Sequence, residues 1–95
     1  MRAGTQELTI EIPSNEWLSA NGRTHWAEKA RRTRALRTRA AFTARNQHIK
    51  AVQTALVTAF ITYPTTGRAD PGNASPTVKA CLDGMTDAGV WEDDD

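Results

Sequence analysis

Apolar and polar residues alternate strictly over residues 7–12, ELTIEI, which puts Leu8, Ile10 and Ile12 on one face. This alternation predicts a strand with its other face exposed to solvent. A later stretch, AVQTALVTAFITYP at residues 51–64, is rich in β-branched residues and mildly apolar on both faces. It predicts a second strand, central in a sheet and covered on both sides.

The arginine-rich stretch from residue 24 to residue 46 predicts a long helix, because its residues are good helix formers. Thr24 is a candidate N-cap, and Glu28 lies in the first turn, where the helix dipole favours a carboxylate. Arginines cover most of this helix, so we expect it to bury little of its surface. Its apolar stripe is narrow: Trp26, Ala30, Thr33, Leu36, Ala40 and Ala44.

A second helix is predicted to begin with Ser75 as N-cap and Pro76 at the first helical position, and Gly89 is a typical stop. The face expected to pack on the core is apolar: Val78, Cys81, Leu82, Met85 and Ala88. The order of elements is therefore β-α-β-α. We expect residues 1–95 to form a single small domain of the α/β (α+β) class.

The supply of large apolar side chains limits the core of this domain. Hydrophobic residues make up 39% of the 95 residues, but fifteen of them are alanine. A short chain with a small core often completes itself by oligomerising. We therefore expect a homodimer.

Charge is distributed unevenly along the chain, although the net charge is only +1. Residues 23–50 hold nine basic residues and one acidic residue, whereas residues 68–95 hold two basic and seven acidic residues. A basic block suits a polyanion, and arginine matches the geometry of phosphate oxygens. The alternative is an exposed helix that only keeps the protein soluble. We expect six arginines to bind the backbone of DNA: Arg23, Arg31, Arg34, Arg37, Arg39 and Arg45.

Cys81 is the only cysteine, which excludes an intramolecular disulfide and a cysteine-based zinc site. The first residues contain no apolar run of the kind found in signal peptides, and the most apolar segment is too short to span a bilayer. These features predict a soluble, cytoplasmic protein without membrane contact.

Acidic residues gather around a single lysine in the last part of the sequence. Asp70 precedes the predicted second helix, Lys79 lies within it, and Asp93 and Asp94 follow it. Carboxylates can hold Mg²⁺ for phosphodiester hydrolysis, and a cation can stabilise the charge that develops on phosphate. The alternative is that Lys79 forms an ordinary surface pair with Asp83 and that the terminal acids are solvated.

These positions resemble the signature of a known family, the RusA-like endodeoxyribonucleases, which resolve Holliday junctions. The resemblance covers most of residues 8–95, and NGRTHW at residues 21–26 contributes to it. It implies a dimeric, magnesium-dependent α/β nuclease that nicks symmetrically across a four-way junction. The residues that carry it most specifically are Asp70, Asn73, Lys79, Asp83, Gly89, Asp93 and Asp94.

The resemblance also implies roles for individual residues. Asp70 and Asp94 would bind Mg²⁺, with Asn73 and Asp93 as further ligands. Lys79 would stabilise the phosphate transition state or the leaving group. The catalytic set implied by the resemblance is therefore Asp70, Lys79 and Asp94.

Two departures from the family pattern leave alternatives open. The segment from Asp70 to Lys79 is longer than in the family and holds one carboxylate, and the sequence lacks the C-terminal strand region with which relatives continue. The leading hypothesis is a structure-selective DNA endonuclease that acts on Holliday junctions or branched DNA in recombination and repair. The alternative is a non-catalytic DNA-binding remnant of that family. A third hypothesis is an adaptor whose arginines bind an acidic protein.

Overall fold

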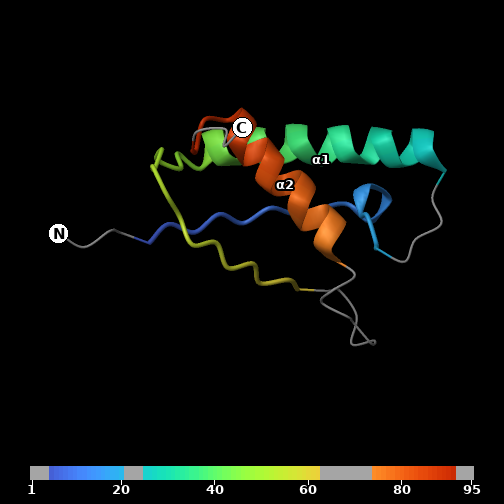
Figure 1. Ribbon diagram of the computed structural model, residues 1–95, viewed down its shortest axis with the longest axis horizontal. Helices are drawn as coiled ribbons and strands as arrows, with labels where there is room; N and C mark the ends of the chain where they lie inside the picture. The colour runs from blue at the N-terminus through green and yellow to red at the C-terminus, as the bar shows by residue number, and fades with distance from the viewer. Residues whose placement is uncertain (1–4, 21–24, 63–73, 92–95) are drawn as a thin grey trace.

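Two crossing helices form the framework of the protein in the computed structural model, which describes residues 5–20, 25–62 and 74–91. A short 3-10 turn, η1 (Ser14–Glu16), precedes the long helix α1 (Trp26–Asn46), and α2 (Ser75–Asp87) follows. In Figure 1, α2 crosses the C-terminal half of α1, and the segments before η1 and after α1 run beneath it as stretched chain. Neither of the two described helices has the length and apolar character that a membrane span requires.

The predicted β-α-β-α fold is wrong, because the residues that the structure describes contain no strand and no sheet. The alternation over residues 7–12 is nevertheless reflected in exposure: Leu8, Ile10 and Ile12 are half-buried, while the polar residues between them are exposed. The face predicted for this segment is therefore correct. Its pairing into a sheet is not.

Side chains take the place of a strand ladder along the N-terminal segment. The side-chain amide of Gln47 donates to the carbonyl oxygen of Thr9 at 2.9 Å and accepts from its backbone N–H at 3.3 Å. The side-chain amide of Gln6 binds Lys50 in the same way: it accepts from the backbone N–H of Lys50 at 2.7 Å and donates to the backbone oxygen of Lys50 at 3.1 Å. Because these amides satisfy backbone groups one residue at a time, the segment is held against the end of α1 without a neighbouring strand.

Helix α1 ends at Asn46 as predicted, but it begins one residue later than predicted because a different residue caps it. His25 is the N-cap, and its Nδ1 accepts a hydrogen bond from the backbone N–H of Ala27 at 3.1 Å. Thr24, the predicted cap, lies outside the described residues. Glu28 in the first turn and Arg45 in the last turn both complement the helix dipole.

Helix α2 begins one position earlier than expected. Ala74 is the N-cap, so Ser75 and Pro76 are the first two helical residues. The predicted stop is confirmed, because Ala88 is the C-cap and Gly89 follows with a φ of 81°. That left-handed conformation is easy for glycine and strained for other residues.

The two helices meet through their smallest side chains. Leu36, Ala40 and Ala44 of α1 are buried as predicted, whereas Trp26, at the start of the predicted stripe, is 75% exposed. A β-carbon on Gly84 of α2 would lie 2.4 Å from the backbone oxygen of Arg37, so the crossing requires glycine at this position.

The buried face of α2 also differs from the predicted one. It consists of Thr77, Ala80 and Gly84, while most of the larger apolar residues stay half-buried on its flank (Val78, Cys81, Leu82, Met85 and Ala88). Without a sheet to cover, large side chains have no flat surface to pack on, and a close helix crossing favours small residues. The buried core cluster is accordingly small, with Leu18, Leu36 and Ala80 at its centre.

Candidate functional site

Lys79 lies on an open groove between α2 and the stretched segment that follows α1. The groove has a volume of about 330 Å³ and is lined by Ala59, Ile61, Ser75, Val78, Lys79 and Leu82. Its two walls come from the predicted second strand and from the first turns of α2. Lys79 is the only charged side chain among these lining residues, so the groove has a cationic rim and an apolar floor.

The Lys79 ammonium is held by one carboxylate of its own helix. Its Nζ lies 2.7 Å from Oδ1 of Asp83, one turn further along α2. The Lys79 side chain is 73% exposed and that of Asp83 34% exposed. Solvent screens a pair of this kind, so it contributes little to stability and leaves the lysine able to exchange partners.

The predicted magnesium ligands belong to the segments on either side of α2 in the sequence. Asp70, Asn73, Asp93 and Asp94 all lie outside the described residues. Within the part of the chain that the structure describes, no three acidic, histidine or cysteine side chains are grouped closely enough to hold a metal ion. The donor types of the four predicted ligands, carboxylate and amide oxygens, nevertheless suit Mg²⁺.

Several arginines predicted to bind DNA instead form hydrogen bonds with acidic residues of the same chain. Arg39 donates two hydrogen bonds to Glu16 of η1, at 2.8 and 2.7 Å, and thereby holds the pKa of Glu16 below its ordinary value. Arg37 donates two to Asp87 of α2, at 3.1 and 2.8 Å, and lowers the pKa of Asp87 in the same way. Arg45 donates to the backbone oxygen of Asp87 at 3.4 Å. These three arginines fasten α1 to its neighbours.

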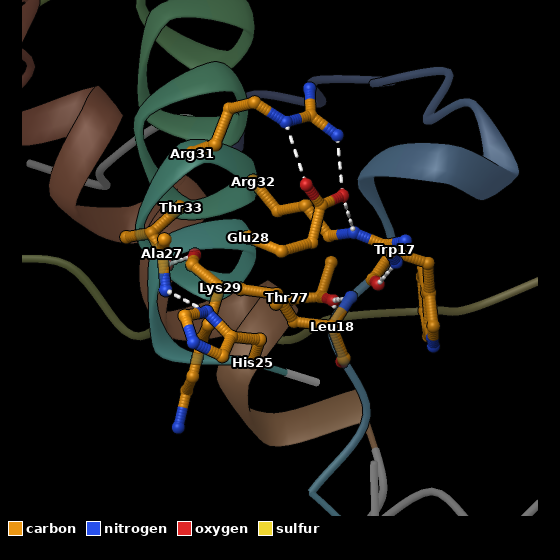
Figure 2. Close-up of polar contacts among 10 residues, drawn as sticks. All are labelled: Trp17, Leu18, His25, Ala27, Glu28, Lys29, Arg31, Arg32, Thr33 and Thr77. Carbon is orange, nitrogen blue, oxygen red and sulfur yellow. Dashed lines mark hydrogen bonds and ion pairs between the residues drawn. The ribbon is translucent and has the colours of Figure 1, made fainter. Parts of the chain in front are cut away.

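Glu28 gathers two further arginines of α1, as Figure 2 shows. Arg31 donates to both of its carboxylate oxygens, and Arg32 donates to one of them at 2.8 Å. The hydrogen bonds from Arg31 and then Arg32 lower the pKa of Glu28 to about 2. Arg32 also donates to the backbone oxygen of Trp17 at 2.9 Å, so this cluster ties the segment after η1 to the first turns of α1.

Arg34 differs from the other predicted DNA-binding arginines. It is exposed and has no hydrogen bond or ion pair among the described residues. It borders a second open groove, of about 950 Å³, between α1 and the N-terminal segment. Arg31 and Phe42 lie on the same groove, and Phe42 is 66% exposed. Arg23, the remaining predicted arginine, lies outside the described residues.

The acids that neutralise α1 were not identified as its partners from the sequence. The spacing of Glu28 from Arg31 and Arg32, three and four residues along a helix, is a sequence signal for that cluster. Glu16 pairs with Arg39 and Asp87 pairs with Arg37 from other elements, so the spacing of residues along the sequence does not predict these contacts.

Comparison with known proteins adds no family assignment to this geometry. The chain matches no protein-family model, and neither the curated proteins nor the solved structures yielded a match.

Proposed function

We propose that the chain is a cytoplasmic, Mg²⁺-dependent, structure-selective endonuclease that hydrolyses phosphodiesters at Holliday junctions or other branched DNA. The observation that carries this proposal is the position of Lys79, which is exposed on an open groove and whose ion-pair partner among the described residues is Asp83, at 2.7 Å. It is joined by the order of Asp70, Asn73, Lys79 and Asp94 in the sequence, which resembles the RusA-like signature.

Lys79 would act by changing partners. In the free protein its ammonium binds the carboxylate of Asp83, and in the complex it would bind a non-bridging oxygen of the scissile phosphate. The charge on that phosphate grows in the transition state, so a cation fixed on a helix stabilises the transition state more than the ground state. Asp83 would position the lysine.

The metal ligands in this proposal are Asp70, Asn73, Asp93 and Asp94. Bound Mg²⁺ would supply charge neutralisation at the phosphate and a more acidic water molecule. In the sequence, Asp70 and Asn73 lie nine and six positions before Lys79, the fifth residue of α2.

A labelled four-way junction incubated with purified protein and Mg²⁺ tests the proposal. Wild-type protein should nick it, and Lys79→Ala should lower the single-turnover rate about 100-fold, the usual loss for one transition-state donor. Lys50→Ala is the matched control, because Lys50 is an exposed lysine that does not line the groove at Lys79, and its removal should leave the rate unchanged. No cleavage by the wild-type protein, or full activity in both Lys79→Ala and Asp70→Asn, would reject it.

A non-catalytic DNA-binding protein is the second candidate, and the exposed guanidinium of Arg34 on the basic helix α1 favours it. Such a protein would bind the same junction with an affinity that falls steeply with salt, because phosphate contacts release counterions. It would show no Mg²⁺-dependent nicking. The binding and cleavage arms of one experiment therefore separate the two functions.

A further inference from the structure

The open groove of about 950 Å³ between α1 and the N-terminal segment is long and has two different walls. Its α1 wall extends from Arg31 to Gln47, which corresponds to about 24 Å along the helix axis. The other wall holds Thr9 and Glu11 of the stretched segment before η1. A groove of this length has room for about seven residues of extended chain.

Two charged side chains on this groove have no ion pair among the described residues. Arg39 and Glu16 neutralise each other at 2.7 Å, and Arg31 is paired with a carboxylate of its own helix. Arg34 on the α1 wall and Glu11 on the other wall are both exposed and form no such pair. Within the described part of the chain, the groove therefore offers one uncommitted cation and one uncommitted anion.

An exposed aromatic ring lies on the same wall as the uncommitted cation. Phe42 is 66% exposed and follows Arg34 by eight positions in the sequence, which is about 12 Å along the axis of α1. Ala35 and Thr38, which lie between them on the groove, are small. The α1 wall therefore presents a cation and an apolar anchor with a shallow stretch between them.

The uncommitted anion lies at the level of the aromatic ring. Thr9 is hydrogen-bonded to the side chain of Gln47, directly after α1. Glu16 is hydrogen-bonded to Arg39, about two turns earlier. The N-terminal segment therefore runs antiparallel to α1, as Figure 1 shows, and Glu11 falls between these two levels. Because the backbone groups of Thr9 are already bound, this wall offers side chains to an occupant there and not a strand edge.

We propose that this groove binds an extended peptide segment of another protein, with an acidic side chain at Arg34, an apolar side chain on Phe42 and a basic side chain at Glu11. Side chains of an extended chain alternate between two opposite directions. The acidic and apolar residues of the peptide both face α1, four residues and about 13 Å apart, and the basic residue next to the apolar one faces the other wall.

Charge complementarity favours this occupant over DNA. A phosphate backbone would gain an interaction at Arg34 and would be repelled at Glu11, whereas a peptide of mixed charge gains at both. The inference goes beyond the proposed nuclease function and does not depend on it, because Lys79 lines a different groove. Peptide binding is measured without DNA and cleavage without peptide, so either proposal can fail alone.

Two fluorescently labelled peptides of seven residues test the proposal by anisotropy. Each carries glutamate and phenylalanine four residues apart, lysine next to the phenylalanine and serine elsewhere, and the second has the reverse order. One of them should bind the full chain with a dissociation constant below about 1 mM. Arg34→Ala and Phe42→Ala should each weaken that binding about tenfold, since each removes one of the anchoring contacts.

Matched controls exist for both variants. Lys29→Ala and Phe60→Ala remove an exposed cation and an exposed aromatic ring that do not line the groove, so they should leave peptide binding unchanged. No binding of either peptide, or equal losses in the variants and their controls, overturns the proposal.

A reciprocal exchange of charge separates a mixed-charge peptide from a polyanion. Replacing the lysine of the peptide by glutamate should weaken binding to the wild-type protein about tenfold, and Glu11→Lys should reverse this preference. Glu7→Lys is the matched control, an exposed glutamate outside the groove, and should keep the wild-type preference. A wild-type protein that prefers the peptide with two glutamates would assign the groove to polyanions such as DNA and would overturn the proposal.

Discussion

The hydroxyl of Thr77 binds both backbone groups of Leu18, a residue 59 positions earlier in the chain. Its Oγ1 lies 2.8 Å from the Leu18 nitrogen, from which it accepts, and 2.8 Å from the Leu18 oxygen, to which it donates. Figure 2 shows this contact beside the arginine cluster of Glu28. Thr77 is 2% exposed and Leu18 5% exposed. A single side chain of α2 therefore satisfies a buried backbone N–H and a buried backbone C=O, groups that would be paired by a neighbouring strand in a sheet.

Thr77→Val should therefore destabilise the fold by about 3 kcal/mol, because valine keeps the shape and leaves a buried N–H and C=O unpaired. Urea unfolding followed by circular dichroism measures this loss. Thr77→Ser keeps the hydroxyl and should recover most of it. Thr38→Val, at an exposed position of α1, is the control and should change stability by less than about 0.5 kcal/mol. Equal effects at positions 77 and 38 would contradict the role of the hydroxyl.

Gly84→Ala should destabilise the protein, although alanine is the better helix former. The added methyl group would lie 2.4 Å from the backbone oxygen of Arg37 and 2.8 Å from Cβ of Ala40, so α1 and α2 would have to separate. We expect a loss of about 1–3 kcal/mol in urea unfolding, against the gain of about 1 kcal/mol at an exposed helical site. A gain in stability would show that the helices do not cross this closely.

Gly89→Ala is the contrast to Gly84→Ala. Its cost of about 1–2 kcal/mol comes from the positive φ of 81°, because no atom of the described residues beyond its own chain neighbours lies within 4 Å of the added carbon. Only Gly84→Ala should also lower the near-UV signal that reports helix packing.

The helices were predictable from the sequence because their signals are local. Good helix formers, a charge in the first turn and a glycine stop depend on neighbours within a few residues, and both helices end within two residues of their predicted bounds. The strand predictions were wrong because a strand forms only when a second strand, often distant in the sequence, pairs with its backbone. Alternation correctly placed Leu8 on the inner side, but the side chain of Gln47, not another strand, binds the backbone of that segment at Thr9.

The candidate site was predictable in part for the same reason. The Lys79–Asp83 pair follows from helical spacing, and the structure has it at 2.7 Å. The arginines of α1 could be recognised as a basic helix, but Glu16 and Asp87 come from other elements and occupy Arg39 and Arg37. Charge counted along the sequence therefore overstates the charge available to a polyanion.

The free energy of unfolding should rise as pH increases from about 2 to 4.5, because the Glu28 carboxylate ionises in this range. Hydrogen bonds from Arg31 and then Arg32 lower its pKa from an ordinary 4.5 to about 2 in the folded protein. Within this window the unfolded chain binds more protons, so the contribution is complete above pH 4.5 and is lost as pH falls through the folded value. Melting temperatures measured from pH 2.5 to pH 6 should show this slope.

Glu28→Gln should flatten that slope, and the lowered pKa values of Glu16 and Asp87 should account for what is left of it. Glu7→Gln is the control, because Glu7 is exposed and forms no ion pair among the described residues. A wild-type slope in Glu28→Gln would show that the arginine cluster does not persist in solution.

Arg34 and Arg39 should respond differently to substitution, because one faces solvent and the other is paired with Glu16 at 2.7 Å. Arg34→Ala should leave the melting temperature unchanged and weaken junction binding, with the slope of log affinity against log salt reduced by about 1. Arg39→Ala should lower stability by about 1 kcal/mol, since it leaves a carboxylate that is 14% exposed without its partner. Fluorescence anisotropy of a labelled junction at several salt concentrations, beside thermal unfolding, measures both effects. Unchanged binding by Arg34→Ala at every salt concentration would mean that α1 does not contact DNA through its unpaired arginine.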